Sequence, residues 1–376
     1  MANGGKKNIL VVYFCATPRL RPTTREHLYC FREYSGHNCY YVNVAFMPVP
    51  KLVWKIPFDL VIFDTLFLCT RWNREGFLRL AEKVSLLKAL DAPKIGLPQD
   101  EFISTDILCD FVNQMGLSTV FSVAPESEWP NIYNTVDRDR VKFHRVLTGY
   151  LSRRVLSTIA RFGKKGVPRN IGIGYRTAGK PYAWFGRHGF LKQDIADLFL
   201  ARAPQKGIKV DISTSNADTI LGDDWYRFLL SCKYTIGVEG GTSILDRDGS
   251  IHERNLRYVK EHPDAAFEEI EAACFPGLDG TFGLSAISPR HLEACATKTC
   301  QILTSGGYNG ILKPGIHYIE LKRDFSNADE VLDLVASDRV RAGMAEKAYQ
   351  DVVASDKYSY ENFVRFVIEN SGTSLS

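Results

Sequence analysis

The amino-acid sequence predicts an α/β protein with two consecutive domains, each built around a parallel β-sheet. The length of 376 residues fits two domains, because single domains usually contain one or two hundred residues. Short apolar runs alternate with longer amphipathic runs, and this alternation occurs once in each half of the chain. Short runs rich in β-branched and aromatic residues, separated by helical patterns, are typical of βαβ units.

Each half contributes its own set of predicted elements. In the first half, strands are predicted at residues 8–14, 40–46, 60–67, 93–98 and 119–123, and helices at 23–35, 73–90, 105–115 and 126–135. In the second half, strands are predicted at 170–175, 208–213, 233–238, 300–303 and 317–321, with a loop-rich stretch after 238. The helices of that half are predicted at 191–201, 223–231, 289–297, 328–335, 338–354 and 360–369.

Residues 137–165 interrupt the alternation with basic residues interleaved among apolar ones. One interpretation is a solvated helix that leads into a linker at 163–168. The other is a basic amphipathic surface for anionic lipid. We therefore expect an N-terminal domain at 1–165, a C-terminal domain at 166–356, and a last helix within 357–376 that packs back on the first domain.

Composition narrows the class of protein. The formal charge is +4, from 47 basic and 43 acidic side chains, and this balance does not indicate nucleic-acid binding. The nine cysteines form no CxxC pair and no zinc-finger spacing, so we interpret them as reduced core residues of a cytoplasmic protein. No apolar stretch is long enough to span a membrane and no signal peptide is evident, although contact with the inner face of a membrane stays open.

The most informative segment is residues 285–310. Ser288 followed by Pro289 predicts a helix start, with a hydroxyl at the N-cap and proline at the first helical position. Arg290 and Glu293 then share one helix face, and a helix N-terminus with an arginine suits a diphosphate. Gly306 and Gly307 follow the next predicted strand, where backbone N–H groups can approach phosphate oxygens. The alternative is a capped amphipathic helix with an Arg–Glu surface pair.

This segment resembles the donor domain of GT-B glycosyltransferases. The Ser-Pro-Arg-x-x-Glu-Ala pattern at 288–294 is similar to that of the spore-maturation-protein-like group and of group 1 glycosyltransferases, and the similarity extends over residues 285–340. The resemblance implies two Rossmann-like domains facing a central cleft, with the acceptor bound by the first domain and a nucleotide sugar by the second. It also implies that Glu293 holds the nucleotide ribose. The diphosphate would contact Arg290 and the loop that includes Gly306, Gly307, Tyr308 and Asn309, and Ser288 would belong to the same donor site.

One position departs from that family pattern. Many retaining members carry a second glutamate eight residues before the ribose glutamate, and this chain has Ser285 there. The choice between retaining and inverting transfer is therefore open.

Two further groups of residues complete the predicted donor site. Arg176, Arg187 and Lys192 follow the first strand of the second domain, where cations would neutralise a leaving diphosphate without a metal; the alternative is ordinary surface charge. Glu239 and Gly240 follow a buried strand and could contact the sugar. The nearby Asp246-x-Asp248 run superficially resembles a metal-binding motif, but such runs are common in turns, so no metal is expected.

The first domain is expected to supply the acceptor pocket and a general base. Asp100 and Glu101 lie just past a predicted strand, at the rim where catalytic groups collect. The alternative is a helix N-cap followed by an acid in the first turn.

These observations lead to one function and two alternatives. The sequence predicts a metal-independent glycosyltransferase without a separate cofactor, which transfers a sugar from a nucleotide sugar to a saccharide or lipid-linked acceptor in polysaccharide or glycan biosynthesis. The alternatives are a sugar-nucleotide epimerase or hydrolase of the same fold, and a non-catalytic nucleotide- or carbohydrate-binding protein. The absence of GxGxxG after a strand and of a GK[ST] loop disfavours NAD enzymes and P-loop NTPases. Donor, acceptor, linkage and oligomeric state are not specified by these patterns.

Overall fold

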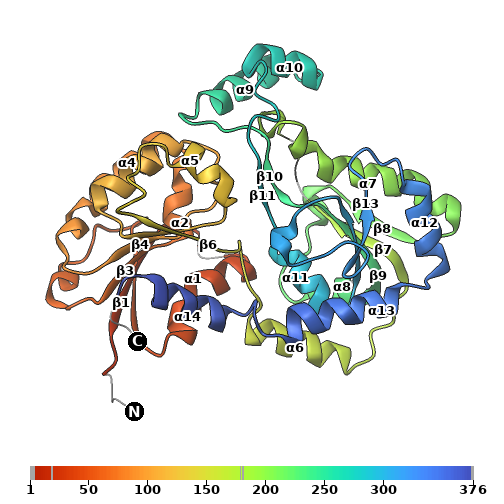
Figure 1. The fold of residues 1–376 in the computed structure, drawn as a ribbon, viewed down its shortest axis with the longest axis horizontal. Helices are drawn as coiled ribbons and strands as arrows, with labels where there is room; N and C mark the ends of the chain where they lie inside the picture. Colours follow the sequence, from red (N-terminus) through yellow and green to blue (C-terminus); the bar gives the residue numbers. More distant parts are fainter. Residues whose placement is uncertain (1–4, 18–19, 178, 180–181, 374–376) are drawn as a thin grey trace. The chain divides into compact units, whose positions relative to one another are not determined.

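The computed structural model describes residues 5–17, 20–177, 179 and 182–373. Internal contacts divide the chain into two compact units. Unit 1 comprises Met1–Leu147, Thr242–Leu284 and Tyr360–Ser376, and unit 2 comprises Thr148–Gly241 and Ser285–Ser359 (Figure 1). The units are discontinuous in sequence, whereas the sequence suggested two continuous domains followed by a returning helix.

Unit 1 is built on a six-stranded parallel sheet with the order β2-β1-β3-β4-β5-β6. Its strands are β1 (Asn8–Tyr13), β2 (Asn38–Asn43), β3 (Leu60–Phe63), β4 (Lys94–Gly96), β5 (Thr119–Ser122) and β6 (Lys142–Arg145). Residues 9–12 of β1 and all of β3 are apolar on both faces and fully buried, as expected of a parallel sheet covered on both sides. The first five strands coincide with predicted ones, and β6 was not predicted.

Helices cover both faces of this sheet. They are α1 (Pro22–Tyr34), α2 (Thr65–Leu68), α3 (Arg74–Val84), α4 (Thr105–Met115), α5 (Trp129–Ile132) and α14 (Tyr360–Asn370), with 3₁₀ turns η1 (Lys51–Lys55), η2 (Cys69–Trp72) and η3 (Ser85–Ala89). Helix α14 packs against α1, where the ring of His27 stacks on Phe363 at 5.5 Å between centroids (Figure 1).

Unit 1 also contains two helices that the sequence analysis assigned to a loop-rich stretch: α9 (Ser250–Glu261) and α10 (Phe267–Cys274). In α9 only Ile251 and Asn255 are buried. The apolar stripe that reveals a helix in sequence is therefore almost missing.

Unit 2 is built on a five-stranded parallel sheet with the order β13-β12-β9-β7-β8. The strands are β7 (Ile171–Arg176), β8 (Val210–Ser213), β9 (Cys232–Gly237), β12 (Cys300–Thr304) and β13 (Tyr318–Leu321). The helices are α6 (Arg153–Gly163), α7 (Leu191–Arg202), α8 (Asp224–Ser231), α11 (Pro289–Ala296), α12 (Ala328–Ser337) and α13 (Arg341–Ala348). A short pair of strands, β10 (Gly240–Thr242) and β11 (Leu284–Ala286), lies where the chain crosses between the units.

Gly174 in β7 shows how tightly this sheet is covered. A Cβ atom at this position would overlap the Sγ atom of Cys232 and lie 2.9 Å from the ring of Phe228 in α8. The glycine therefore allows α8 to approach the sheet closely.

The basic stretch at 137–165 does not form one helix. Residues 142–145 form strand β6 of unit 1, and α6 begins separately in unit 2, where Ser152 accepts a hydrogen bond from Val155 N. On α6, Arg154 and Arg161 both pair with Asp223, at 3.3 and 3.4 Å. Asp223 therefore neutralises part of the positive charge that a lipid-binding surface at 137–165 would need.

All nine cysteines are free, and seven of them are buried. Among the described residues, no helix combines the length and the apolar character needed to cross a bilayer.

Candidate functional site

Several of the polar residues predicted for the donor site lie on loops at the carboxyl edge of the unit 2 sheet. Strands β7, β9 and β12 are parallel neighbours, so the loops that follow them leave from the same edge, where ligands bind in α/β sheets. A cavity of about 110 Å³ lies there. It is lined by Thr177, Gly179, Tyr182, Phe185, His188, Gly189, Lys192, Gln193, Glu239 and Gly241.

Helix α11 presents its N-terminus at this edge, because its C-terminus leads into the start of β12. Ser288 precedes the helix, and its backbone N–H donates to Nδ1 of His291 at 3.1 Å. His291 is buried, and burial, followed by the charge of Arg290, lowers its pKa to about 3. The imidazole is therefore neutral, and its bond with Ser288 N fixes the first turn of α11.

Arg290 and Glu293 lie together on α11 beside β7 and α8. The Arg290 guanidinium donates to the carbonyl oxygen of Arg176 at 2.8 Å and lies 5.9 Å from the ring centroids of Tyr175 and Trp225. Glu293 is only 5% exposed, and its Oε2 accepts a hydrogen bond from Trp225 Nε1 at 2.7 Å. The indole thus fixes the orientation of a carboxylate that sequence analysis assigned to ribose binding.

Glu239 organises the loop after β12. Its two carboxylate oxygens accept hydrogen bonds from Gly307 N at 2.9 Å and Tyr308 N at 2.6 Å. A Cβ atom on residue 306 would overlap Glu239 Oε2, so only glycine allows this approach. We call this arrangement the Glu239 clamp.

The Glu239 clamp changes the expected roles of these residues. Two backbone N–H groups expected to face a diphosphate are engaged by a carboxylate instead, and both oxygens of Glu239, which also lines the cavity, are occupied by these hydrogen bonds. Asn309 accepts from Ile287 N at 2.9 Å, which ties the loop to the segment just before α11. The loop supports the site as a scaffold, and Gly240 follows Glu239 as the first residue of β10.

The three predicted cations differ in their surroundings. Arg176 pairs with Asp211 of β8 at 2.6 Å, and its guanidinium lies over the ring of Phe228. It therefore joins β7, β8 and α8 instead of lining the cavity. Lys192 lines the cavity, and its charge contributes to the low pKa of His291. Arg187 is exposed in the 3₁₀ turn η6 (Arg187–Phe190), which also supplies His188 and Gly189 to the cavity wall.

In unit 1, Glu101 is completely buried, and its carboxylate is saturated by hydrogen bonds. It accepts from Ser122 Oγ at 2.6 Å, from Val123 N at 2.8 Å, from Ala124 N at 3.2 Å and from the hydroxyl of Tyr133. Burial raises the pKa of Glu101, although the bonds from Ser122 and Tyr133 act in the opposite direction. No lone pair is left for an acceptor hydroxyl, so this arrangement is a structural one and does not fit the predicted base.

Asp100 lies at the carboxyl edge of the unit 1 sheet and is partly exposed. Its backbone has a φ of 52°, and its Oδ2 accepts from Trp72 Nε1 at 3.0 Å. The loop that carries it is held by Arg71, a buried arginine that sequence analysis missed. Arg71 donates to the carbonyl oxygens of Leu68, Gln99, Asp100 and Ile103.

The Asp246-x-Asp248 run caps α9. Asp246 accepts from Ile251 N at 3.2 Å and His252 N at 2.8 Å, and Asp248 accepts from Ser250 N at 3.0 Å. Within the described ranges, no group of three or more His, Cys, Asp or Glu side chains is arranged to hold a metal ion.

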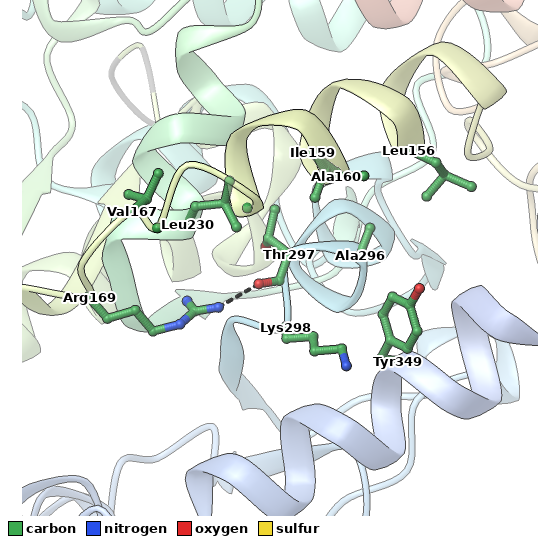
Figure 2. A pocket seen from close by; sticks show the side chains of 12 residues that line it. Leu156, Ile159, Ala160, Val167, Arg169, Leu230, Ala296, Thr297, Lys298 and Tyr349 are labelled. Carbon is green, nitrogen blue, oxygen red and sulfur yellow. Dashed lines mark hydrogen bonds between the residues drawn. The ribbon is translucent and has the colours of Figure 1, made fainter.

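A second cavity of unit 2, of about 430 Å³, lies at the opposite end of α11, beside Ala296, Thr297 and Lys298 (Figure 2). Its other walls are mainly apolar side chains of α6 and the segment after it. Arg169 points into this region, but its guanidinium donates to the carbonyl oxygens of Thr297 and Cys232. This cavity therefore has a structural arginine and is separate from the Glu293 site.

Comparison with known proteins supports the architecture. No protein-family model matches the sequence, and no curated protein sequence matches it. Anabaena HepE in complex with UDP-glucose aligns over 96% of this chain and 99% of its own, with 12% identity and a TM-score of 0.52. HepE in complex with UDP and glucose aligns over 96% and 98%, with 11% identity and a TM-score of 0.53. The predicted GT-B fold is confirmed.

Proposed function

We propose that this chain is a glycosyltransferase that moves a sugar from a nucleotide-sugar donor to a saccharide or lipid-linked acceptor. The observation that carries the proposal is Glu293, a buried carboxylate oriented by Trp225 at the carboxyl edge of a parallel sheet, with Arg290 beside it. A carboxylate in this position is suited to accept hydrogen bonds from the two hydroxyls of a ribose. The similarity of 288–294 to the spore-maturation-protein-like group supports the same assignment.

The diphosphate of the donor is assigned to side chains and to the N-terminus of α11. The Glu239 clamp engages the N–H groups of Gly307 and Tyr308, so the loop after β12 does not supply them. Arg290 and Lys192 bring two positive charges to the same edge, and the first turn of α11 adds its partial positive charge.

The same positive charges would also promote the transfer reaction. As the bond between the sugar and the diphosphate breaks, negative charge builds on the departing phosphate. Arg290 and Lys192 would stabilise that charge without a metal ion, and the nucleotide sugar needs no separate cofactor. Asp100 remains the proposed base for the acceptor hydroxyl, because it is partly exposed at the carboxyl edge of unit 1.

The donor proposed first is a uridine diphosphate sugar, because the HepE structures contain UDP and UDP-glucose. The nine free cysteines fit a reducing compartment and support a cytoplasmic location.

Calorimetry with UDP, GDP, ADP, CMP and dTDP tests this proposal without an acceptor. We expect one nucleoside diphosphate to bind, and Glu293→Gln to weaken its binding about 10- to 100-fold, because a carboxamide offers one acceptor oxygen in place of two. Glu330→Gln is the matched control, since Glu330 is exposed on α12 of the same unit. Unchanged affinity in Glu293→Gln, or no binding of any nucleotide, would contradict the proposal.

Incubation with the donor alone separates transfer from the alternatives. A transferase should turn over its donor slowly until an acceptor is added, whereas a hydrolase or epimerase should convert it at full rate. A binding module should leave the donor intact in both conditions.

A further inference from the structure

Unit 1 exposes an unusually apolar segment in the connection between β2 and β3. The most exposed large apolar side chains of this connection are Phe46, Met47, Leu52 and Trp54, at 74%, 52%, 62% and 42%. We call them, together with Lys51 and Lys55, the 46–55 surface. Soluble proteins scatter exposed apolar residues singly, so four of them within nine positions call for a partner.

The local structure explains why these side chains point outward. The crossover between β2 and β3 contains only the 3₁₀ turn η1, in which Val53 N bonds to Pro50 O. Val53 is 5% exposed and anchors the turn to the core, so its neighbours Leu52 and Trp54 must face away. In an ordinary amphipathic helix, by contrast, the positions that face away from the core carry polar residues.

The charge around the 46–55 surface is positive. Lys51 and Lys55 are exposed on η1 itself, and Lys83 of α3 donates to the carbonyl oxygen of Val44 at 3.2 Å. The sequence contains no acidic residue between Glu33 and Asp59, and Asp59 pairs with Lys7 at 3.5 Å. Glu82, which precedes Lys83 in α3, is the acidic residue nearest in sequence to the contact between Lys83 and Val44.

We propose that the 46–55 surface docks unit 1 onto an anionic lipid bilayer. Tryptophan and phenylalanine side chains favour the headgroup level of a membrane, and lysines beside them attract anionic lipids. A stable protein dimer needs about 800 Å² per partner with a complementary shape, which four side chains on one connection do not supply. A bilayer requires no such complementarity. The inference does not depend on the proposed nucleotide site, and it places membrane contact at 46–55 instead of at 137–165.

Vesicle co-sedimentation tests whether the lysines of the 46–55 surface contribute to membrane binding. We expect binding to vesicles of phosphatidylcholine with about 30% phosphatidylglycerol, and much weaker binding to phosphatidylcholine alone. Each lysine near an anionic surface contributes about fivefold in affinity, so Lys51→Glu with Lys55→Glu should reduce binding at least about 20-fold. The matched control is Lys164→Glu with Lys165→Glu, an exposed pair at the end of α6, which should bind as the unchanged protein does.

Serine substitutions at exposed apolar positions test the contribution of the apolar side chains to membrane binding. Leu52→Ser with Trp54→Ser should lose most vesicle binding while the urea midpoint stays unchanged. Leu200→Ser, which alters an exposed leucine on α7 of unit 2, should have no effect.

Three results would overturn the inference. The first is equal binding to neutral and anionic vesicles, and the second is full binding by the Leu52→Ser, Trp54→Ser variant. The third is a concentration-dependent dimer in sedimentation velocity that this variant abolishes without any vesicle binding, since the surface would then join two copies of the chain.

Discussion

Both units of this protein use a buried charged side chain to hold a loop at the carboxyl edge of a parallel sheet, but the two charges have opposite sign. In unit 1, Arg71 donates to four carbonyl oxygens of residues 68–103. In unit 2, Glu239 accepts from the N–H groups of Gly307 and Tyr308. Each loop can leave regular structure because its backbone groups are satisfied by a side chain.

The difference in sign decides what each loop can still offer a ligand. Arg71 occupies carbonyl oxygens of the unit 1 loop, and the Asp100 side chain of that loop remains partly exposed. Glu239 occupies N–H groups, so the unit 2 loop offers fewer donors to a phosphate. We therefore propose that Arg290 and Lys192 recognise the anion. A glycine-rich loop after a strand is thus not by itself a phosphate site.

Removal of the arginine should cause the largest loss. Arg71→Met should lower the free energy of unfolding by about 3–5 kcal/mol, because four carbonyl oxygens lose a charged donor and several are buried. Urea denaturation measures this change. The control is Arg79→Met, since the Arg79 side chain is 70% exposed and pairs with Glu75 four residues away; it should change stability by less than about 0.5 kcal/mol. A similar small change in Arg71→Met would show that its loop is held by other contacts.

Removal of the negative charge should cost somewhat less. Glu239→Gln should lower the free energy of unfolding by about 2–3 kcal/mol, because the amide group turns one acceptor into a donor that faces a backbone N–H. The same denaturation experiment applies, with Glu330→Gln as the control. The variant should also weaken UDP binding indirectly, since the Glu239 clamp supports the loop that Asn309 ties to the start of α11. Unaltered stability would refute the role given to the clamp.

His27 of unit 1 and His291 of unit 2 are both buried histidines, and acid should destabilise the protein through each of them. Burial lowers the pKa of His27 to about 4 and that of His291 to about 3. Because the unfolded chain binds a proton at about pH 6.5 and the folded one does not, stability is lost as the pH falls from 6.5 towards 4. At pH 5 the contribution of His27 should be a loss of about 2 kcal/mol relative to pH 7.

The variant His27→Phe isolates that contribution, because it keeps a ring against Phe363 of α14 and removes the titrating group. Urea denaturation at pH 7 and pH 5 should show the variant losing about 2 kcal/mol less than the unchanged protein. Equal losses in both proteins would mean that His27 is protonated without cost.

The sequence predicted the fold, but not the contacts that surround the candidate site residues. Strands such as residues 8–14 and 60–67 were recognisable because apolar runs of that length are local signals. Strand β6 was missed because the basic residues around Lys142 masked its short apolar pattern, and α9 was missed because it buries only two side chains.

Other contacts depend on residues far apart in the chain. The bond from Tyr308 N to Glu239 joins residues 69 positions apart, and that from Arg71 to Ile103 joins residues 32 apart. Glu101 and Asp100 are neighbours in sequence with opposite environments, and no local pattern separates the buried one from the partly exposed one. Arg176 was expected to face a diphosphate. Its ion-pair partner in β8, Asp211, is distant in sequence and comes beside it only when the sheet forms.

The most direct test of the central claim compares the calorimetric affinities of UDP and 2′-deoxy-UDP for the unchanged protein and for Glu293→Gln. If Glu293 accepts hydrogen bonds from the ribose, removal of one hydroxyl should weaken binding to the unchanged protein about 10-fold or more, and the variant should discriminate much less. Equal affinity of the unchanged protein for the two nucleotides would contradict the assignment of Glu293 to the ribose, and with it the site on which the proposed function depends.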